Sequence, residues 1–271
     1  YVHPNIQPHY EKKEGLLSVS DHFSMMNLLT SKTNAKELER QMINIWRIAN
    51  YYSSSWGCSY SIAERLSLSG TPLNEALVSL HRIIPKFQKE NKLQKVQCVV
   101  LTDGEANSLP RHVEIKIGDS KPYIGAQRLN GGISFIRDRK LGTTYAVGYN
   151  FFKFSEILLD NLKDNFPQVN FIGIRVVSSR DASGFIKMYC DIGSKEHTSI
   201  QTEWKKTKSF CIKNAGYDAY FGISASALSQ DTDFEVDEGA TKAKIKSAFV
   251  KSLKTKKLNK KVLGEFISLV A

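Results

Sequence analysis

Two oxygen-bearing side chains occupy positions where a metal site can form. Thr71 precedes Pro72 at the start of a predicted helix, and Asp103 follows the short apolar run Lys95–Leu101. One helix and one strand separate them, which returns the chain to the same edge of a sheet. Hydroxyl and carboxylate oxygens are the ligands that hard divalent cations prefer. The sequence therefore predicts part of a magnesium or manganese site.

Plainer interpretations of both residues stay open at this point. Thr71 can serve as the N-cap of the helix, with Pro72 in the first helical position. Asp103-Gly104 can be an ordinary turn after a strand. The sequence offers no nucleophile–base pair and no paired carboxylates, and its cysteines are scattered singly. We therefore expect a binding module rather than a catalyst, a zinc protein or a disulfide-stapled domain.

The order of the predicted elements indicates how the candidate residues are positioned. With 271 residues the chain can form one large domain. Apolar runs that do not alternate with polar residues, separated by helical patterns, favour an α/β fold with a mostly parallel sheet and helices on both faces. The strands are predicted at Gly15–Ser24, Lys95–Leu101, Val169–Ser178 and Tyr217–Leu228, and the helices at Asn34–Ser53, Pro72–Ile84, Phe154–Phe166, Ala182–Ile192 and His197–Asn214.

Local signals refine this scheme. Asn34, with Glu37 three residues later, predicts the start of an amphipathic helix. Pro85 should kink or end the helix that begins near Thr71. The segment 111–148 is punctuated by Asn130-Gly131-Gly132 and Leu141-Gly142-Thr143, and this pattern predicts β-hairpins inserted after a central strand.

The residues around Thr71 and Asp103 resemble a known family. Ser69-Gly70-Thr71-Pro72-Leu73-Asn74-Glu75-Ala76, followed by Val99-Val100-Leu101-Thr102-Asp103-Gly104-Glu105, is similar to the second and third metal-site loops of von Willebrand factor type A (VWA) domains. The resemblance is nearest to the VWA proteins of tailed bacteriophages and the VWA subunits of cobaltochelatases. It implies a Rossmann-like fold with a metal-ion-dependent adhesion site at the top of the sheet.

The same resemblance assigns roles to residues and partners. Thr71 and Asp103 would contact Mg²⁺ or Mn²⁺, directly or through water, while Gly70 and Gly104 supply turn geometry and Ser69 and Glu105 support the loops. The metal's open position would accept a carboxylate from a protein partner, and a MoxR-type AAA+ ATPase is a partner of several relatives. A viral protein of the host cytoplasm or the virion is the implied setting.

One part of the family pattern is missing from the sequence. The first metal-site loop, Asp-x-Ser-x-Ser, does not occur, and Ser18-Val19-Ser20-Asp21 does not supply it. We expect that residues 15–230 form a VWA-like domain that lacks its first strand, which an upstream segment or another chain would provide. Residues 1–14 are predicted to form a loop. Because oxygen-ligand sites depend on ligand number and charge, we expect the chain alone to bind metal weakly.

The C-terminal segment 231–271 carries an uneven charge. Five acids between 231 and 238 precede nine lysines between 242 and 261, within a chain of formal net charge +11. The alternative to a metal-dependent module is a viral protein that binds nucleic acid through a helical, basic tail; a solvated helix face is the plainer interpretation. The lysines proposed for this role are Lys251, Lys254, Lys256, Lys257, Lys260 and Lys261. No apolar run is long enough to span a membrane, so no membrane partner is expected.

Overall fold

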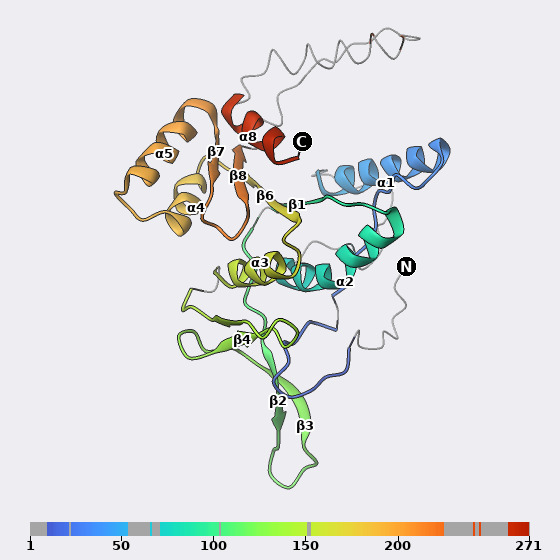
Figure 1. The fold of residues 1–271 in the computed structure, drawn as a ribbon, viewed down its shortest axis with the longest axis vertical. Helices are drawn as coiled ribbons and strands as arrows, with labels where there is room; N and C mark the ends of the chain where they lie inside the picture. The colour runs from blue at the N-terminus through green and yellow to red at the C-terminus, as the bar shows by residue number, and fades with distance from the viewer. Residues whose placement is uncertain are drawn as a thin grey trace.

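A four-stranded sheet organises the computed structural model of the chain (Figure 1). The structure describes residues 10–21, 23–53, 66, 71–102, 104–150, 153–224, 241, 244 and 260–270. The strand order is β1-β6-β8-β7, where β1 is Val96–Thr102, β6 is Val169–Val177, β8 is Ala219–Ser224 and β7 is Ser209–Ile212. β6 pairs in parallel with both β1 and β8, and only β7 is antiparallel. The predicted mostly parallel sheet, with Lys95–Leu101 beside Val169–Ser178, is confirmed.

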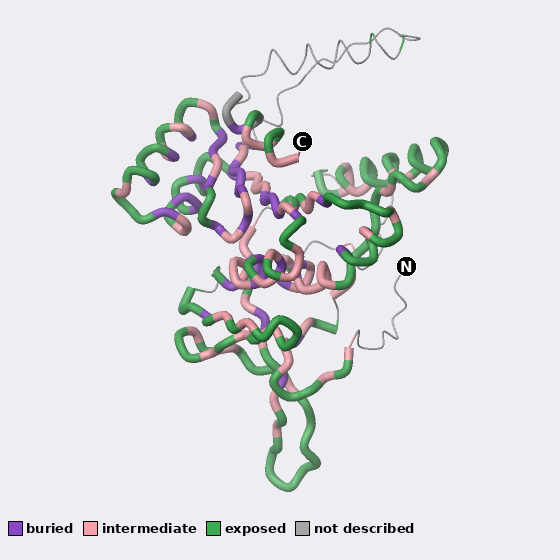
Figure 2. The backbone as a smooth tube through the Cα atoms, viewed as in Figure 1, coloured by how far each residue is buried: buried purple, intermediate pink, exposed green. Residues whose placement is uncertain are grey.

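Both faces of the sheet carry helices, also as predicted. The main core lies on one face, where α2 (Leu73–Asn91), α3 (Phe154–Asn165), α4 (Ala182–Tyr189) and α5 (Lys195–Thr207) bury their apolar residues against the strands. On the other face, α8 (Lys260–Val270) packs Val262 and Phe266 against Ile172 and Phe221. Figure 2 shows the buried residues gathered in the sheet and the adjoining helices.

Two β-hairpins follow β1, as predicted for 111–148. The first consists of β2 (Arg111–Ile115) and β3 (Tyr123–Gln127), and the second of β4 (Phe135–Arg137) and β5 (Thr144–Ala146). They lie on the far side of α2 and α3 from the sheet, and β2–β3 extends away from the body (Figure 1). Asp138 ties the second hairpin to α3 by accepting hydrogen bonds from the side chains of Asn161 and Asn165, at 2.8 and 2.7 Å.

Helix α1 (Ala35–Ser53) starts as the sequence predicts. The backbone N–H of Glu37 donates to the Asn34 side chain at 2.9 Å, which satisfies one of the free donors at the helix start. None of the helix's residues is buried, however, and its apolar side chains face outward. Trp46 is 62% exposed and Met42 is 59% exposed. The apolar stripe that gives this helix its periodicity therefore has no core to cover within the described residues.

Two predicted elements at other places are wrong. Gly15–Ser24 is not a strand: only Leu17 forms an isolated bridge, to Arg111, and Gly15 takes a positive φ of 79° that interrupts extended pairing. Residues 197–214 do not form one helix. Lys208 adopts the left-handed conformation that ends α5, and the chain returns as the edge strand β7.

The helix after Thr71 differs in two details from the prediction. It begins at Leu73 with Pro72 in the N-cap position, so Thr71 is not its cap. It also continues through Pro85 to Asn91, so of the two predicted effects of Pro85, a kink or an end, the end is wrong. The lysine-rich segment falls almost wholly outside the described residues, including Lys251, Lys254, Lys256 and Lys257, and nothing describes the side chains of Lys260 and Lys261. Across the described ranges, no helix has the length and apolar character that a membrane crossing requires.

Candidate functional site

The start of α2 and the loop after β1 meet at the carboxyl end of the sheet's edge strand. Thr71 lies against Gly104: a β-carbon on Gly104 would be 3.2 Å from the Thr71 hydroxyl oxygen. Because Thr71 does not cap α2, this hydroxyl makes no hydrogen bond with any residue that the structure describes. Gly104 directly follows Asp103 in the chain, and the predicted convergence of Thr71 with Asp103 stays a prediction. Asp103 itself, like Ser69 and Gly70, lies outside the described residues.

Thr102, the last residue of β1, bonds through its side chain to the loop that follows the strand. The Thr102 hydroxyl donates to the carbonyl of Gly104 at 2.8 Å and accepts from the Gly104 backbone N–H at 3.2 Å. Both backbone groups of Gly104 are therefore bonded to the Thr102 side chain, which fixes Gly104 relative to the end of β1.

A buried asparagine connects this loop to two helices. Asn74, fully buried in the first turn of α2, donates to the carbonyl of Asn107 at 2.7 Å and accepts from the Ser155 hydroxyl of α3 at 2.7 Å. Buried polar groups persist when their partners satisfy them, and such a network fixes the relative position of its members. Asn74 therefore holds the loop against the N-terminal ends of α2 and α3, where helix dipoles favour a nearby anion.

An ion pair fixes the other side of the loop. The guanidinium of Arg175, on β6 beside Thr102, pairs with the carboxylate of Glu105. Both side chains are mostly buried, at 11% and 14% exposure, and the guanidinium also lies 4.5 Å from the centre of the Phe185 ring. The carboxylate of Glu105 therefore has a charged partner within the fold. Arg175 was not among the residues predicted from the sequence.

A small cavity lies beneath the loop, among side chains of the sheet and α3. Its volume of about 10 Å³ suits a single water molecule. Glu105, Glu156 and Tyr217 line it, and burial raises the pKa of the Glu156 carboxyl. The Tyr217 hydroxyl is buried and finds no hydrogen-bond partner among the described residues. A water bound here would satisfy that hydroxyl and connect it to the carboxylates.

Among the described residues, this edge offers one oxygen donor of a divalent-metal site, the hydroxyl of Thr71. Within the described ranges, no group of three or more His, Cys, Asp or Glu side chains gathers as metal ligands do. Asp103, the predicted carboxylate ligand, lies outside the described residues. Mg²⁺ commonly uses one or two carboxylates and keeps several waters, so a hydroxyl and one carboxylate would be enough for a weak site.

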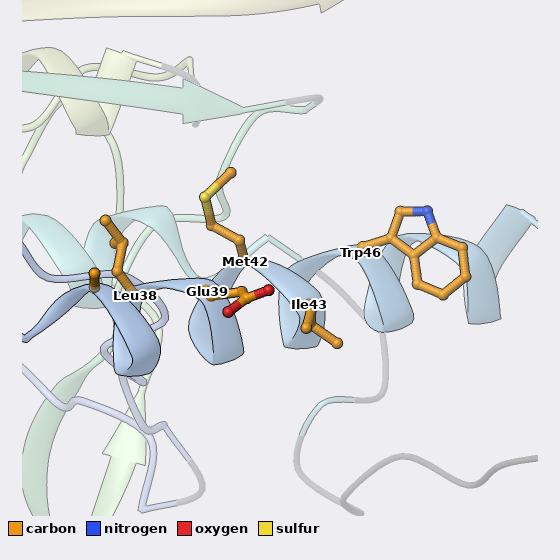
Figure 3. Close-up of a pocket in the computed structure, with 6 residues that line it drawn as sticks. Leu38, Glu39, Met42, Ile43 and Trp46 are labelled. Carbon is orange, nitrogen blue, oxygen red and sulfur yellow. The ribbon is translucent and has the colours of Figure 1, made fainter. Parts of the chain in front are cut away.

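A second hollow, larger than the cavity beneath the loop, lies elsewhere and has a different character. It measures about 520 Å³ and runs along α1, lined by Ala35, Leu38, Glu39, Met42, Ile43 and Trp46 (Figure 3). All six lining residues come from one helix, so the hollow is an exposed apolar helix face and not an enclosed ligand pocket.

Comparison of the chain with protein-family models, with curated proteins and with solved structures finds no match. The geometry around Thr71 and Gly104 is therefore the observation from which a function has to be argued.

Proposed function

We propose that this chain is a metal-dependent protein-binding module, in which Thr71 and Asp103 hold Mg²⁺ or Mn²⁺ at the carboxyl end of β1. One observation carries the proposal: the Thr71 hydroxyl, unused as a helix cap, lies against the glycine that follows Asp103. The metal would leave an open coordination position facing solvent. A carboxylate on the surface of a partner protein is the ligand that suits such a position.

The contacts of the residues that flank Asp103 in the sequence support this role. A binding site needs its first ligands held by other contacts, so that the protein does not have to reorganise when the metal arrives. Asn74, the Thr102 turn and the Arg175–Glu105 pair supply three independent anchors around Asp103. None of these three contacts involves the Thr71 hydroxyl.

The exposed edge of β1 supports a second part of the proposal, that a further strand completes the site. Among the described residues, no strand pairs with β1 on the side opposite β6. β1 contains no proline and no charged residue, and its Val99 and Leu101 are 46% and 70% exposed. Natural sheets seldom leave such an edge uncovered, because its free N–H and C=O groups recruit another strand.

A strand added to this edge in parallel would end beside Asp103. It would come from another chain or from a longer form of this one, and by the resemblance to VWA domains it would carry Asp-x-Ser-x-Ser. Its carboxylate and hydroxyls would raise the number of oxygen ligands, and with it the affinity for the metal.

Manganese binding measured by electron paramagnetic resonance tests the proposal. We expect weak binding by the 271-residue chain, and binding at least about tenfold tighter when a synthetic strand peptide with Asp-x-Ser-x-Ser is added. Asp103→Ala should abolish both, whereas Asp191→Ala, at an exposed position after α4, should change neither. Tight binding that survives Asp103→Ala would show that the metal site lies elsewhere.

A further inference from the structure

The two hairpins form a protruding surface that the metal site does not use. We call residues 111–149 the hairpin surface. It lies beyond α2 and α3, and β2–β3 projects into solvent (Figure 1). Most of its residues are exposed (Figure 2). A β-ribbon that makes so few contacts with the body contributes little to the core, which leaves its exposed side chains available to a partner.

Positive charge is concentrated on this surface and is not neutralised. Seven basic side chains are all exposed, and none forms an ion pair with a residue that the structure describes. Only three acids share the segment, and one of them, Asp138, is directed inward to α3. The basic residues are Arg111, Lys116, Lys121, Arg128, Arg137, Arg139 and Lys140. Unpaired cations at this density attract a polyanion.

Aromatic rings lie exposed among these cations. Tyr123 is 51% exposed, Phe135 is 64% exposed and Tyr149 is 86% exposed. The Tyr149 ring rests on Gly132, where a β-carbon would come within 2.3 Å of it, so only glycine allows the ring to lie there. Tyr123 and Ile115 similarly lie over Gly125. Tyr123 and Tyr149 thus lie close to glycine backbone, and all three rings expose much of their surface to solvent.

The pairing register places a ring and a cation on the same face of the second hairpin. In β4, Ile136 contacts the main core, and its partner Tyr145 donates a hydrogen bond to Asp164 of α3. Side chains alternate along a strand, so Phe135 and Arg137 both point away from the body. The outer face of this hairpin therefore presents an aromatic ring and a guanidinium two residues apart.

We propose that the hairpin surface binds nucleic acid, independently of the metal site. Lysine and arginine would contact the phosphates, and the exposed rings would stack on bases, which is the combination that single-strand-binding surfaces use. A two-stranded ribbon such as β2–β3 also has the width that the major groove of duplex DNA admits. An acidic protein would use the cations but has no bases for the rings, so nucleic acid accounts for both features.

Fluorescence anisotropy with labelled oligonucleotides, one single-stranded and one duplex, tests this proposal on the full chain. The test variant carries Lys116→Gln, Lys121→Gln, Arg128→Gln and Arg139→Gln. The matched control removes four exposed lysines from the α4–α5 side, by Lys187→Gln, Lys195→Gln, Lys205→Gln and Lys206→Gln. Both variants have the same net charge and keep the lysine-rich C-terminal segment, so their difference reports the hairpins alone.

We expect the test variant to lose about tenfold or more in affinity relative to the control. The slope of log affinity against log salt concentration should also become shallower, by roughly 0.7 to 0.9 for each phosphate contact removed. Tyr123→Ala with Phe135→Ala should weaken single-stranded binding roughly fivefold or more for each stacked base lost. If Tyr123→Ala with Phe135→Ala leaves duplex affinity unchanged while the test variant lowers it, the β2–β3 ribbon binds a duplex groove.

Equal affinities of test and control variants would overturn the proposal. So would a loss seen only when Lys251, Lys254, Lys256, Lys257, Lys260 and Lys261 are changed to Gln, because binding would then reside in the C-terminal segment. Binding of polyglutamate as tight as that of the oligonucleotides, insensitive to the aromatic changes, would assign the surface to an acidic protein instead.

Discussion

The hydroxyl of Thr71 and the α-carbon of Gly104 are neighbours across the loop that leaves β1, so close that a β-carbon on Gly104 would stand 3.2 Å from the hydroxyl oxygen. This contact places the start of α2 against the residue that follows Asp103. It also makes Gly104 a position where a small change in volume tests the site without replacing a proposed ligand.

Gly104→Ala should displace the Thr71 hydroxyl by a few tenths of an ångström. Gly104 does not have a positive φ, so the backbone accepts alanine without strain. We expect the free energy of unfolding to change by less than about 1 kcal/mol, while manganese affinity falls several-fold because the hydroxyl leaves its position. Urea unfolding and manganese titration measure the two effects, and unchanged metal affinity would argue against Thr71 as a ligand.

Breaking the Arg175–Glu105 pair should destabilise the fold strongly. Either Arg175→Met or Glu105→Gln leaves the remaining partner without its ion pair in a mostly buried position, which costs about 3 to 5 kcal/mol in comparable pairs.

The double variant provides the control for this prediction. With both partners replaced, no charge is left unpaired, so its loss of unfolding free energy should be smaller than the sum of the two single losses. Denaturation in urea measures all three variants. If the loss of unfolding free energy in the double variant equalled the sum of the two single losses, the two side chains would not stabilise each other.

The second hairpin should detach from α3 in acid. Hydrogen bonds from Asn165, Leu141 and Asn161 hold the pKa of Asp138 far below its ordinary value. A carboxyl with a depressed folded-state pKa stabilises the protein above its unfolded pKa of about 3.9, and this contribution is lost progressively as the pH falls below that value.

Asp138→Asn should therefore weaken the fold at pH 7 and flatten the loss of stability below about pH 4. Unfolding free energies measured between pH 7 and pH 3 test this, with Asp119→Asn in the β2–β3 turn as the matched change. Parallel pH profiles for the wild-type chain and Asp138→Asn would contradict the assigned role of Asp138.

Much of the sheet could be predicted from the sequence, because its parallel strands are apolar runs that do not alternate with polar residues. β6 and the buried part of β1 follow from that pattern, and Asn34 marks the start of α1 correctly. β7 could not be predicted, since Phe210 and Cys211 fit the spacing of the preceding helix and the break depends on the backbone of Lys208.

The sequence predicts that Thr71 lies near the end of β1, but it does not predict that Arg175 pairs with Glu105. Topology alone brings Thr71 towards the end of β1, whereas the partner of Glu105 depends on a register that only the structure gives. A charged residue inside the apolar run of β6 was the available signal, because a buried arginine requires an anion. The exposure of Leu101 could not be foreseen either, since it depends on which strands flank β1.

Joint coordination by Thr71 and Asp103 is the central claim, and a double-mutant cycle for manganese binding tests it most directly. The four proteins are the wild-type chain, Thr71→Ala, Asp103→Ala and the double variant, each with the completing strand peptide present and each checked for folding by circular dichroism. If both side chains contact one metal ion, Asp103→Ala removes binding and Thr71→Ala adds nothing further in its absence. Independent, additive losses, or binding that survives in the double variant, would contradict a shared site.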